Sequence, residues 1–359
     1  MGCYEQMKPM APVTNARKVG IGAEPARDAA RGRHEGLDLL RAGGMFLVTA
    51  QHVLSLAGHG EWTSFHSINV GQLGVAVFLG ISAVLAVASD RPPVSWILQR
   101  FARLFPAYWV TMGACFVLVW ATGYKSFDGR QFLSQMLGLG LFTHAGNLVN
   151  VPTWFVSLLL VCYLAFFVAK LAARLCWTNV VLLAAVATWI EWNGYPWPWI
   201  HVLTFFLTST LASVIPRRHQ GVMFVATGGL LLLASGHSVA FAYAGITVGA
   251  IGMSSYVTSS TPFVRTASRY SYEYYLVHGP CLVGMMTLFD NHVVLGVLSG
   301  LALAAVVSVL LHNTVLWAVG RMYGCFANDL GAFRGTPPRS ENAGIRQLED
   351  AAGDPVEAG

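Results

Sequence analysis

Two ionisable side chains lie on the same face of one apolar stretch near the start of the chain. The stretch LDLLRAGGMFLVTAQHV, residues 37–53, contains Arg41 and His52, which are eleven positions apart. On an α-helix this separation is about three full turns with a rise of about 16 Å, so both side chains point the same way. An arginine can bind an anion or polarise a carbonyl group, and a histidine can act as a general base. The spacing therefore indicates chemistry inside a membrane helix, where ionisable groups are expensive and commonly functional.

Both residues also have a simpler explanation. Arg41 lies near the cytosolic end of the predicted helix and can extend its charge to the membrane surface as an anchor. His52 can be a core histidine that is hydrogen-bonded by a neighbouring helix. The placement of the two side chains on one face favours the chemical interpretation.

A second candidate site is a pair of arginines in the segment QRFARLFPAYW. Arg100 and Arg103 are three positions apart, just before a helix that Pro106 is expected to open. Two guanidinium groups at this spacing can hold phosphate oxygens through paired hydrogen bonds. The alternative is ordinary positive charge at the cytosolic end of a membrane span.

A third candidate site is a polar stripe in the segment SRYSYEYYLVHGP, residues 268–280. Ser271, Tyr275 and His278 occupy positions i, i+4 and i+7, which share one face of a helix. A polar stripe on an apolar helix is expected to face the bundle interior or a cavity. Hydrogen bonding between helices is the alternative role.

The composition assigns these residues to a membrane protein. Of 359 residues, 55% are hydrophobic and only 11% are charged, so we expect an all-α, polytopic integral membrane helical bundle. The net charge of +5 does not indicate a nucleic-acid partner, because the cations lie mainly at the ends of apolar runs. The six cysteines form no CxxC pair, and glycines interrupt the series His52, His59 and His66, so no metal site is expected.

Ten apolar runs are long enough to cross a bilayer inside a bundle. The predicted spans are 37–57, 71–89, 104–122, 153–170, 178–192, 197–215, 221–236, 239–257, 270–289 and 293–318. A further run at 131–142 is predicted not to cross, because an additional crossing would leave several lysines and arginines outside. Both termini are then cytosolic, with a disordered arm at 1–36, a membrane domain at 37–320 and a disordered tail at 321–359.

The motifs and their order resemble the acyltransferase 3 family of integral-membrane acyltransferases, over about residues 35–320. The matching residues are Arg41 and His52 of an R-x10-H opening helix, Arg100, Arg103, Pro106 and Tyr108 of an R-x-x-R and P-x-Y segment, Trp154 and Ser157 of a W-x-L-S-like segment, and Ser271, Tyr272, Tyr275, Leu276 and His278 of a late S-Y-x-x-Y-L-x-H motif. Two positions depart from the family pattern. Ala83 replaces the glycine of a Ser-Gly pair, and Leu159 stands where many members carry a glutamate, a role that Glu273 or Glu191 would have to fill.

The resemblance implies transfer of an acetyl or other short acyl group from acyl-CoA to a hydroxyl of a cell-surface or secreted polysaccharide. It implies His52 as general base with Arg41 beside the thioester, and Arg100 and Arg103 on the coenzyme A phosphates. The remaining matched residues, Trp154, Ser157, Ser271, Tyr272, Tyr275 and His278, are expected to form a substrate or structural site. No permanently bound cofactor is implied, since acetyl-CoA is a donor substrate.

The resemblance also implies a bacterial inner (cytoplasmic) membrane location. The expected partners are membrane lipid, a carbohydrate acceptor that a lipid can carry, and polysaccharide assembly machinery. A macrolide or other secondary metabolite is an alternative acceptor. A transporter or flippase for a lipid-linked saccharide is the alternative function, and a glycan polymerase is disfavoured because the longest predicted outer connection is only about 123–152.

Overall fold

The computed structural model describes residues 35–123, 125–172, 181, 183–185, 187–189, 200–290 and 292–333, with side chains to residue 317 apart from 144 and 145. The helices are α2 (Glu35–Leu56), α3 (Val70–Val87), α4 (Pro93–Thr122), α5 (Gly129–Met136), α6 (Gly140–His144), α7 (Trp154–Ala172), α9 (Ile200–Val214), α10 (Arg217–Leu233), α11 (Val239–Ser254), α12 (Pro262–Leu288) and α13 (Val293–Phe333). Short 3₁₀ turns are η1 (Gly60–Thr63), η2 (Ala145–Asn147), η3 (Val151–Thr153) and η4 (Ala234–Gly236). The predicted arm at 1–36, apart from its last two residues, and most of the predicted span 178–192 lie outside the described residues.

A small hairpin follows α2. Its strands, β1 (Ser64–Phe65) and β2 (Ile68–Asn69), are antiparallel, and Ser64 pairs with Asn69. His66 and Ser67 form the turn with φ angles of 47° and 68°, the left-handed values that tight hairpin turns require. Asn69 then caps α3, since its side chain accepts hydrogen bonds from the first backbone amides of that helix.

The chain is an all-α, multi-pass membrane protein. Among the described residues, six helical segments are long and apolar enough to cross a membrane: α2, α3, α4, Val151–Ala172, Arg217–Gly236 and Val293–Trp317. Two shorter apolar helices, α9 and α11, accompany them. The predicted number of ten spans and the cytosolic placement of the termini stay predictions.

The predicted start of the span 104–122 is wrong. The span expected to begin at residue 104 is part of a helix that begins at Pro93, so Arg100 and Arg103 lie on α4 rather than in a loop before it. Pro106 does not open this helix but lies inside it. Proline removes one helical hydrogen bond, which a membrane bundle tolerates because neighbouring groups satisfy the freed carbonyl.

Two other segments follow the predicted boundaries only in part. The run 131–142 contains two short helices, α5 and α6, separated by Gly138 with a φ of 75°, so no single helix there is long enough to cross. Helix α13 continues to Phe333. The first part of the segment 321–359 is therefore helical, and the rest of it lies outside the described residues.

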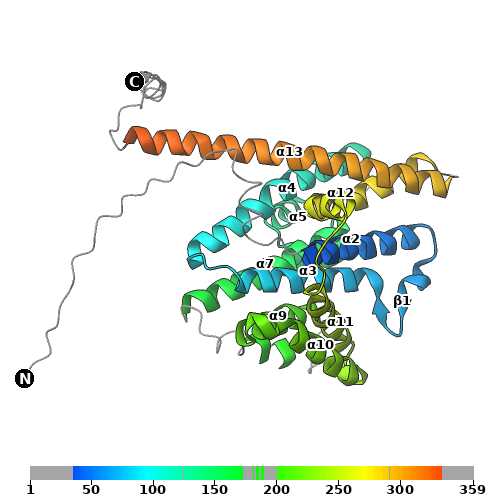
Figure 1. Cartoon of the computed structure of the whole chain (residues 1–359). Helices are drawn as coiled ribbons and strands as arrows, with labels where there is room; N and C mark the ends of the chain where they lie inside the picture. The colour runs from blue at the N-terminus through cyan, green and yellow to red at the C-terminus, as the bar shows by residue number, and fades with distance from the viewer. Residues whose placement is uncertain are drawn as a thin grey trace, which may run out of the picture.

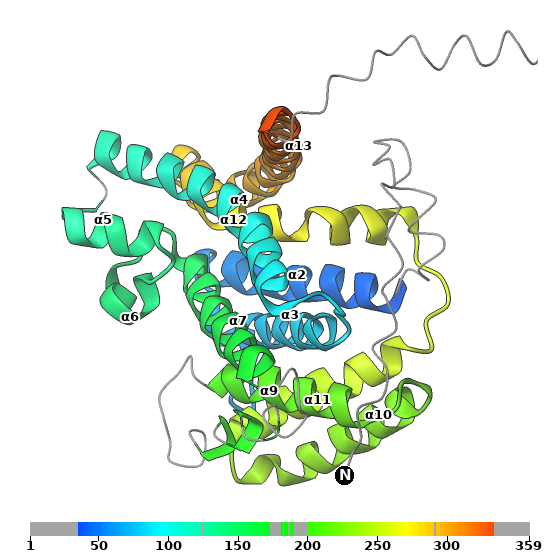
Figure 2. The ribbon, with the colours of Figure 1, turned by 90° about the vertical axis from the view of Figure 1, so that its left-hand side faces the viewer.

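Helix α2 lies in the middle of the bundle, between α3 and α12 (Figure 1). Helix α13 packs on α12 and crosses one side of the molecule, while α9, α10 and α11 form a layer on the opposite side (Figures 1 and 2). The largest apolar cluster joins α3, α4, α7 and α9 and includes Trp96, Phe155, Phe166 and Phe205. This core packs α3 against α9 and α7 against α4 and α9, while α3 also packs on the central helix α2.

The packing of α2 on α3 depends on two glycines. A methyl group at Gly74 would collide with the backbone carbonyl oxygen of Gly44 and would lie 2.9 Å from Val48. Such close approach of two helix backbones is a common way for membrane helices to associate. It brings α3 close to the part of α2 that carries His52.

We expect Gly74→Ala to destabilise the bundle by about 1–3 kcal/mol, because added atoms in a close-packed contact force the helices apart. Thermal unfolding of the purified protein in detergent would measure the loss. Gly43→Ala is the matched control, since a methyl group there meets nothing within 4 Å. Equal unfolding temperatures for the two variants would contradict the importance of this contact.

Candidate active site

A cavity of about 140 Å³ lies where α2, α3, α7 and α12 meet. The lining residues are Val48, Gln51 and His52 of α2, Gly71, Gln72 and Val75 of α3, Val151 and Trp154 near the start of α7, and Tyr275 of α12. It is smaller than the roughly 300–1,000 Å³ of pockets that enclose a drug-sized ligand. The cavity can therefore hold only the reacting ends of large substrates.

His52 contacts a second histidine beside this cavity. The ring centroids of His52 and His278 are 5.1 Å apart and the ring planes are tilted by 54°. His278 is fully buried, and its Nδ1 lies 2.8 Å from the carbonyl oxygen of Tyr275. Residues 226 positions apart in the sequence thus form one polar group inside an apolar bundle.

Hydrogen bonds to the backbone position the other wall of the cavity. The Tyr275 hydroxyl donates to the carbonyl of Pro152 at 2.8 Å, and the Asn150 amide donates to the carbonyl of Leu276 at 2.8 Å. These bonds join the segment before α7 to α12 and so place Trp154 at the cavity. Behind it, the Trp154 ring stacks on His201, with centroids 6.2 Å apart.

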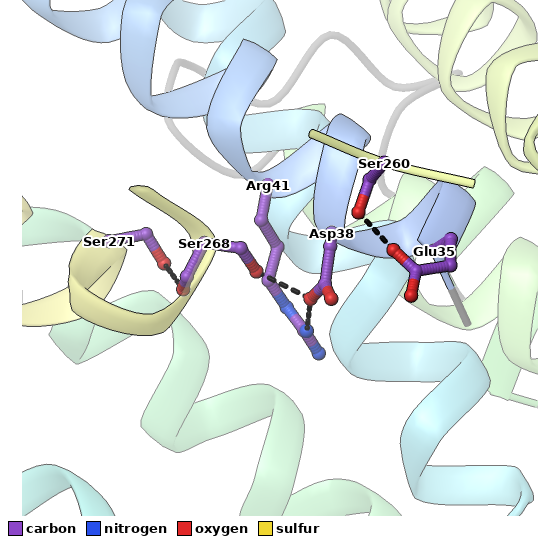
Figure 3. Close-up of polar contacts among 6 residues, drawn as sticks. All are labelled: Glu35, Asp38, Arg41, Ser260, Ser268 and Ser271. Carbon is purple, nitrogen blue, oxygen red and sulfur yellow. Dashed lines mark hydrogen bonds and ion pairs between the residues drawn. The ribbon is translucent and has the colours of Figure 1, made fainter. Parts of the chain in front are cut away.

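Arg41 belongs to a separate polar cluster at the start of α2. Its Nη1 donates to the Asp38 carboxylate at 3.2 Å, and the same carboxylate oxygen accepts from the Ser268 hydroxyl at 2.6 Å (Figure 3). Ser271 donates in turn to the Ser268 carbonyl at 2.9 Å. Close by, Glu35 accepts a hydrogen bond from Ser260 (Figure 3). The cluster connects α2 to α12 and to the segment before it.

The two arginines of α4 lie in different surroundings. Arg100 Nη2 donates to the carbonyl of Leu85 at 3.2 Å, and its guanidinium lies 5.5 Å from the ring centre of Trp96 and 5.6 Å from that of Tyr163. Arg103 is exposed, and it is near enough to Arg41 for their positive charges to repel each other. The three arginines form a positive region, in which Arg100 is partly buried and Arg103 is exposed.

The structure therefore separates the predicted site residues into two groups. His52, Tyr275 and Trp154 line the cavity, and His278 contacts His52 beside it. Arg41 lies in the positive region, about 16 Å along α2 by the rise of a helix. The polar stripe does face the interior, since Ser271, Tyr275 and His278 are all buried.

The remaining predicted site residues make structural contacts. The Tyr272 hydroxyl donates to the carbonyl of Leu104 at 2.9 Å, and the buried Ser157 hydroxyl accepts from the Leu141 amide at 3.4 Å. Oε1 of Glu273 lies 2.9 Å from Nδ1 of His312 on α13. Glu191 lies outside the described residues. Leu159 is part of the apolar core.

Sequence reasoning missed Asp38, Gln51 and Gln72 as site residues. Asp38 had a signal, because it precedes Arg41 by three positions and so shares its helix face. No sequence pattern identified the two glutamines, apart from the position of Gln51 next to His52. Among the side chains that the structure describes, no group of three histidine, cysteine, aspartate or glutamate residues could hold a metal ion.

Asp38→Asn should weaken the junction of α2 and α12, because it leaves the Arg41 guanidinium without its charged partner. Hydrogen bonds to charged groups contribute roughly 1.5–3 kcal/mol, so we expect a loss of that size in thermal unfolding. Ser268→Ala removes one hydrogen bond to the same carboxylate but leaves the pair of Arg41 and Asp38 in place, so it should cost less than Asp38→Asn, which changes both interactions. If Asp38→Asn unfolds no earlier than Ser268→Ala, the carboxylate is not what holds this junction.

Comparison with known families gives one match. A family model described as an acyltransferase domain, acyltransferase 3, matches residues 34–313, which is 280 of the 359 residues. The match contains both polar groups, from Asp38 to His278. No curated protein and no solved structure matches the chain.

Proposed function

The chain belongs to the acyltransferase 3 family, and from this premise we propose that it moves an acetyl or other short acyl group from acyl-CoA to a hydroxyl of a cell-surface or secreted polysaccharide. The observation that carries the proposal is the cavity in which His52 lies beside Trp154 and Tyr275. It supplies a ring nitrogen in a small, partly enclosed and mostly apolar space. Such a space limits the access of water to the thioester.

In the proposed reaction His52 is the general base. It takes the proton of the acceptor hydroxyl while the hydroxyl oxygen bonds to the thioester carbonyl carbon. The carbon–sulfur bond then breaks, and His52 gives the proton to the departing thiolate, which leaves as free coenzyme A. Base catalysis of this kind contributes about 10²–10⁴ in rate.

The positive region explains how the donor would bind. Coenzyme A carries its phosphates at one end and its thioester at the other, separated by the long pantetheine arm. Arg103 is exposed near Arg41, and Arg41 is about 16 Å along α2 from His52. We therefore assign Arg41 to the phosphates instead of the thioester. Phosphates held at the arginines would leave the arm free to run along α2, with the acyl group in the cavity.

The finer features of the setting are part of this proposal. We place ten spans in a bacterial inner membrane with both termini in the cytosol, so that the arginines face the compartment that holds acyl-CoA. The acceptor is a polysaccharide sugar, which a lipid can carry, and the enzyme works beside polysaccharide assembly machinery. A macrolide is the alternative acceptor.

His52→Ala should lower acylation by about 10²–10⁴-fold, because the general base is lost. The measurement is the content of O-acetyl groups on the surface glycan of a complemented deletion strain, by NMR, after membrane insertion has been confirmed. His59→Ala is the matched control, since His59 lies outside the cavity and stacks on Trp62. Undiminished acylation in His52→Ala would rule out His52 as the base.

Arg103→Ala should weaken the binding of acetyl-CoA by about 10- to 100-fold, which corresponds to the loss of a charge-assisted hydrogen bond. Binding of radiolabelled acetyl-CoA to the purified protein measures this. Arg217→Ala, at an exposed arginine that begins α10, should bind normally. Transport of a lipid-linked sugar with no coenzyme A requirement would favour the flippase alternative instead.

A further inference from the structure

His278 is held in one orientation by its own helix. It is fully buried on α12, and its ring lies almost parallel to that of Tyr274, with centroids 6.0 Å apart and planes 4° from parallel. Its Nδ1 lies 2.8 Å from the Tyr275 carbonyl oxygen and 3.3 Å from that of Tyr274. The ring therefore has little freedom to rotate.

These contacts determine which nitrogen of His278 carries the proton. A carbonyl oxygen can only accept a hydrogen bond, so Nδ1 must be the donor. In the neutral ring Nε2 then carries a lone pair and is an acceptor. Nε2 is buried and has no hydrogen-bond partner within the described part of the chain. A buried acceptor without a partner calls for an explanation, because nearly all such groups are satisfied.

The nearest ring that can supply a donor is that of His52, which is in contact with His278. A neutral imidazole has one N–H and one lone pair, so it can donate with one nitrogen while the other accepts. His52 also lines the cavity, where the proposed acceptor hydroxyl would lie. Hydrogen bonds of this kind are often open in a ligand-free enzyme and close when substrate is bound.

We propose that His278 is the positioning residue for His52, with Nε2 of His278 accepting a hydrogen bond from the N–H of His52 that faces away from the cavity. This inference rests on the proposed function. The bond fixes the tautomer of His52, so that its lone pair points to the acceptor hydroxyl. When His52 takes the hydroxyl proton, the same bond stabilises its positive charge until the proton passes to the thiolate.

The arrangement resembles the way a carboxylate orients the histidine of a hydrolase triad, with a neutral imidazole in the place of the carboxylate. Among the described residues that line the cavity, none is an aspartate or glutamate. The Glu273 carboxylate contacts His312, and the Asp38 carboxylate accepts a hydrogen bond from Arg41. The ring of His278 is in direct contact with His52, and its Nε2 lone pair can accept the N–H of His52.

Two substitutions separate this role from a structural one. His278→Asn places an amide near Nδ1 and keeps the bond to the Tyr275 carbonyl, but it removes the distal acceptor. His278→Gln places an amide oxygen close to the position that Nε2 occupies in the wild type, and it loses the hydrogen bond from Nδ1 to the Tyr275 carbonyl. We expect His278→Asn to lower kcat by about 10- to 100-fold, the loss seen when the partner of a metal-binding histidine is removed. His278→Gln should keep most of the activity, and KM for acetyl-CoA should not change in either variant.

The assay is acetyl transfer by purified, folded protein in proteoliposomes. Higher kcat in His278→Gln than in His278→Asn supports the proposal, whereas equal values or the reverse order would overturn it. If His278→Asn does not fold, His278→Leu replaces it, and equal activity of the Leu and Gln variants overturns the proposal. His312→Gln is the control for a half-buried histidine on another helix and should keep normal kcat.

The same assay distinguishes failure of this inference from failure of the proposed function. If wild-type protein transfers no acetyl group, or if His52→Ala retains full transfer, the proposed function fails whatever the His278 variants do. If His52→Ala is inactive and the order of the two His278 variants is reversed, only the role of His278 is wrong.

Discussion

The packing of α2 against α12 is the contact on which the candidate site depends. At the start of α2 it is held by the hydrogen bond from Ser268 to Asp38, and further along it brings His52 against His278. Since both pairs occur in the same order along α2 and α12, the two helices run in the same direction. This one interface therefore fixes the distance between the charged cluster at Asp38 and the neutral pair of His52 and His278.

The two ends of that interface suit different chemistry. At one end the Asp38 carboxylate balances only part of the positive charge of Arg41, Arg100 and Arg103, so the region still attracts anions. At the other end, one histidine, two glutamines and a tyrosine line the cavity together with apolar side chains, and a charge formed there during reaction would be weakly screened. A donor with phosphates at one end and a thioester at the other matches this polarity.

Much of the fold was predictable because apolar runs must form helices in lipid, where backbone groups have no water partners. The common face of Arg41 and His52, and the burial of the stripe that contains His278, follow from helical periodicity alone. The start of α4 was not predictable in this way. Pro106 suggested that a helix begins there, but the proline lies inside α4, which begins at Pro93. The contact between His52 and His278 is tertiary, and no local pattern encodes it.

The most direct measurement is a cryo-EM structure of the protein in a lipid nanodisc with a non-hydrolysable acyl-CoA analogue. We expect the acyl carbonyl of the analogue in the cavity between His52 and Trp154, with the phosphates at Arg41 and Arg103. Density for the acyl group at the lipid-facing surface, or phosphates bound at the cavity end of α2, would contradict the assignment of the cavity as the reaction centre.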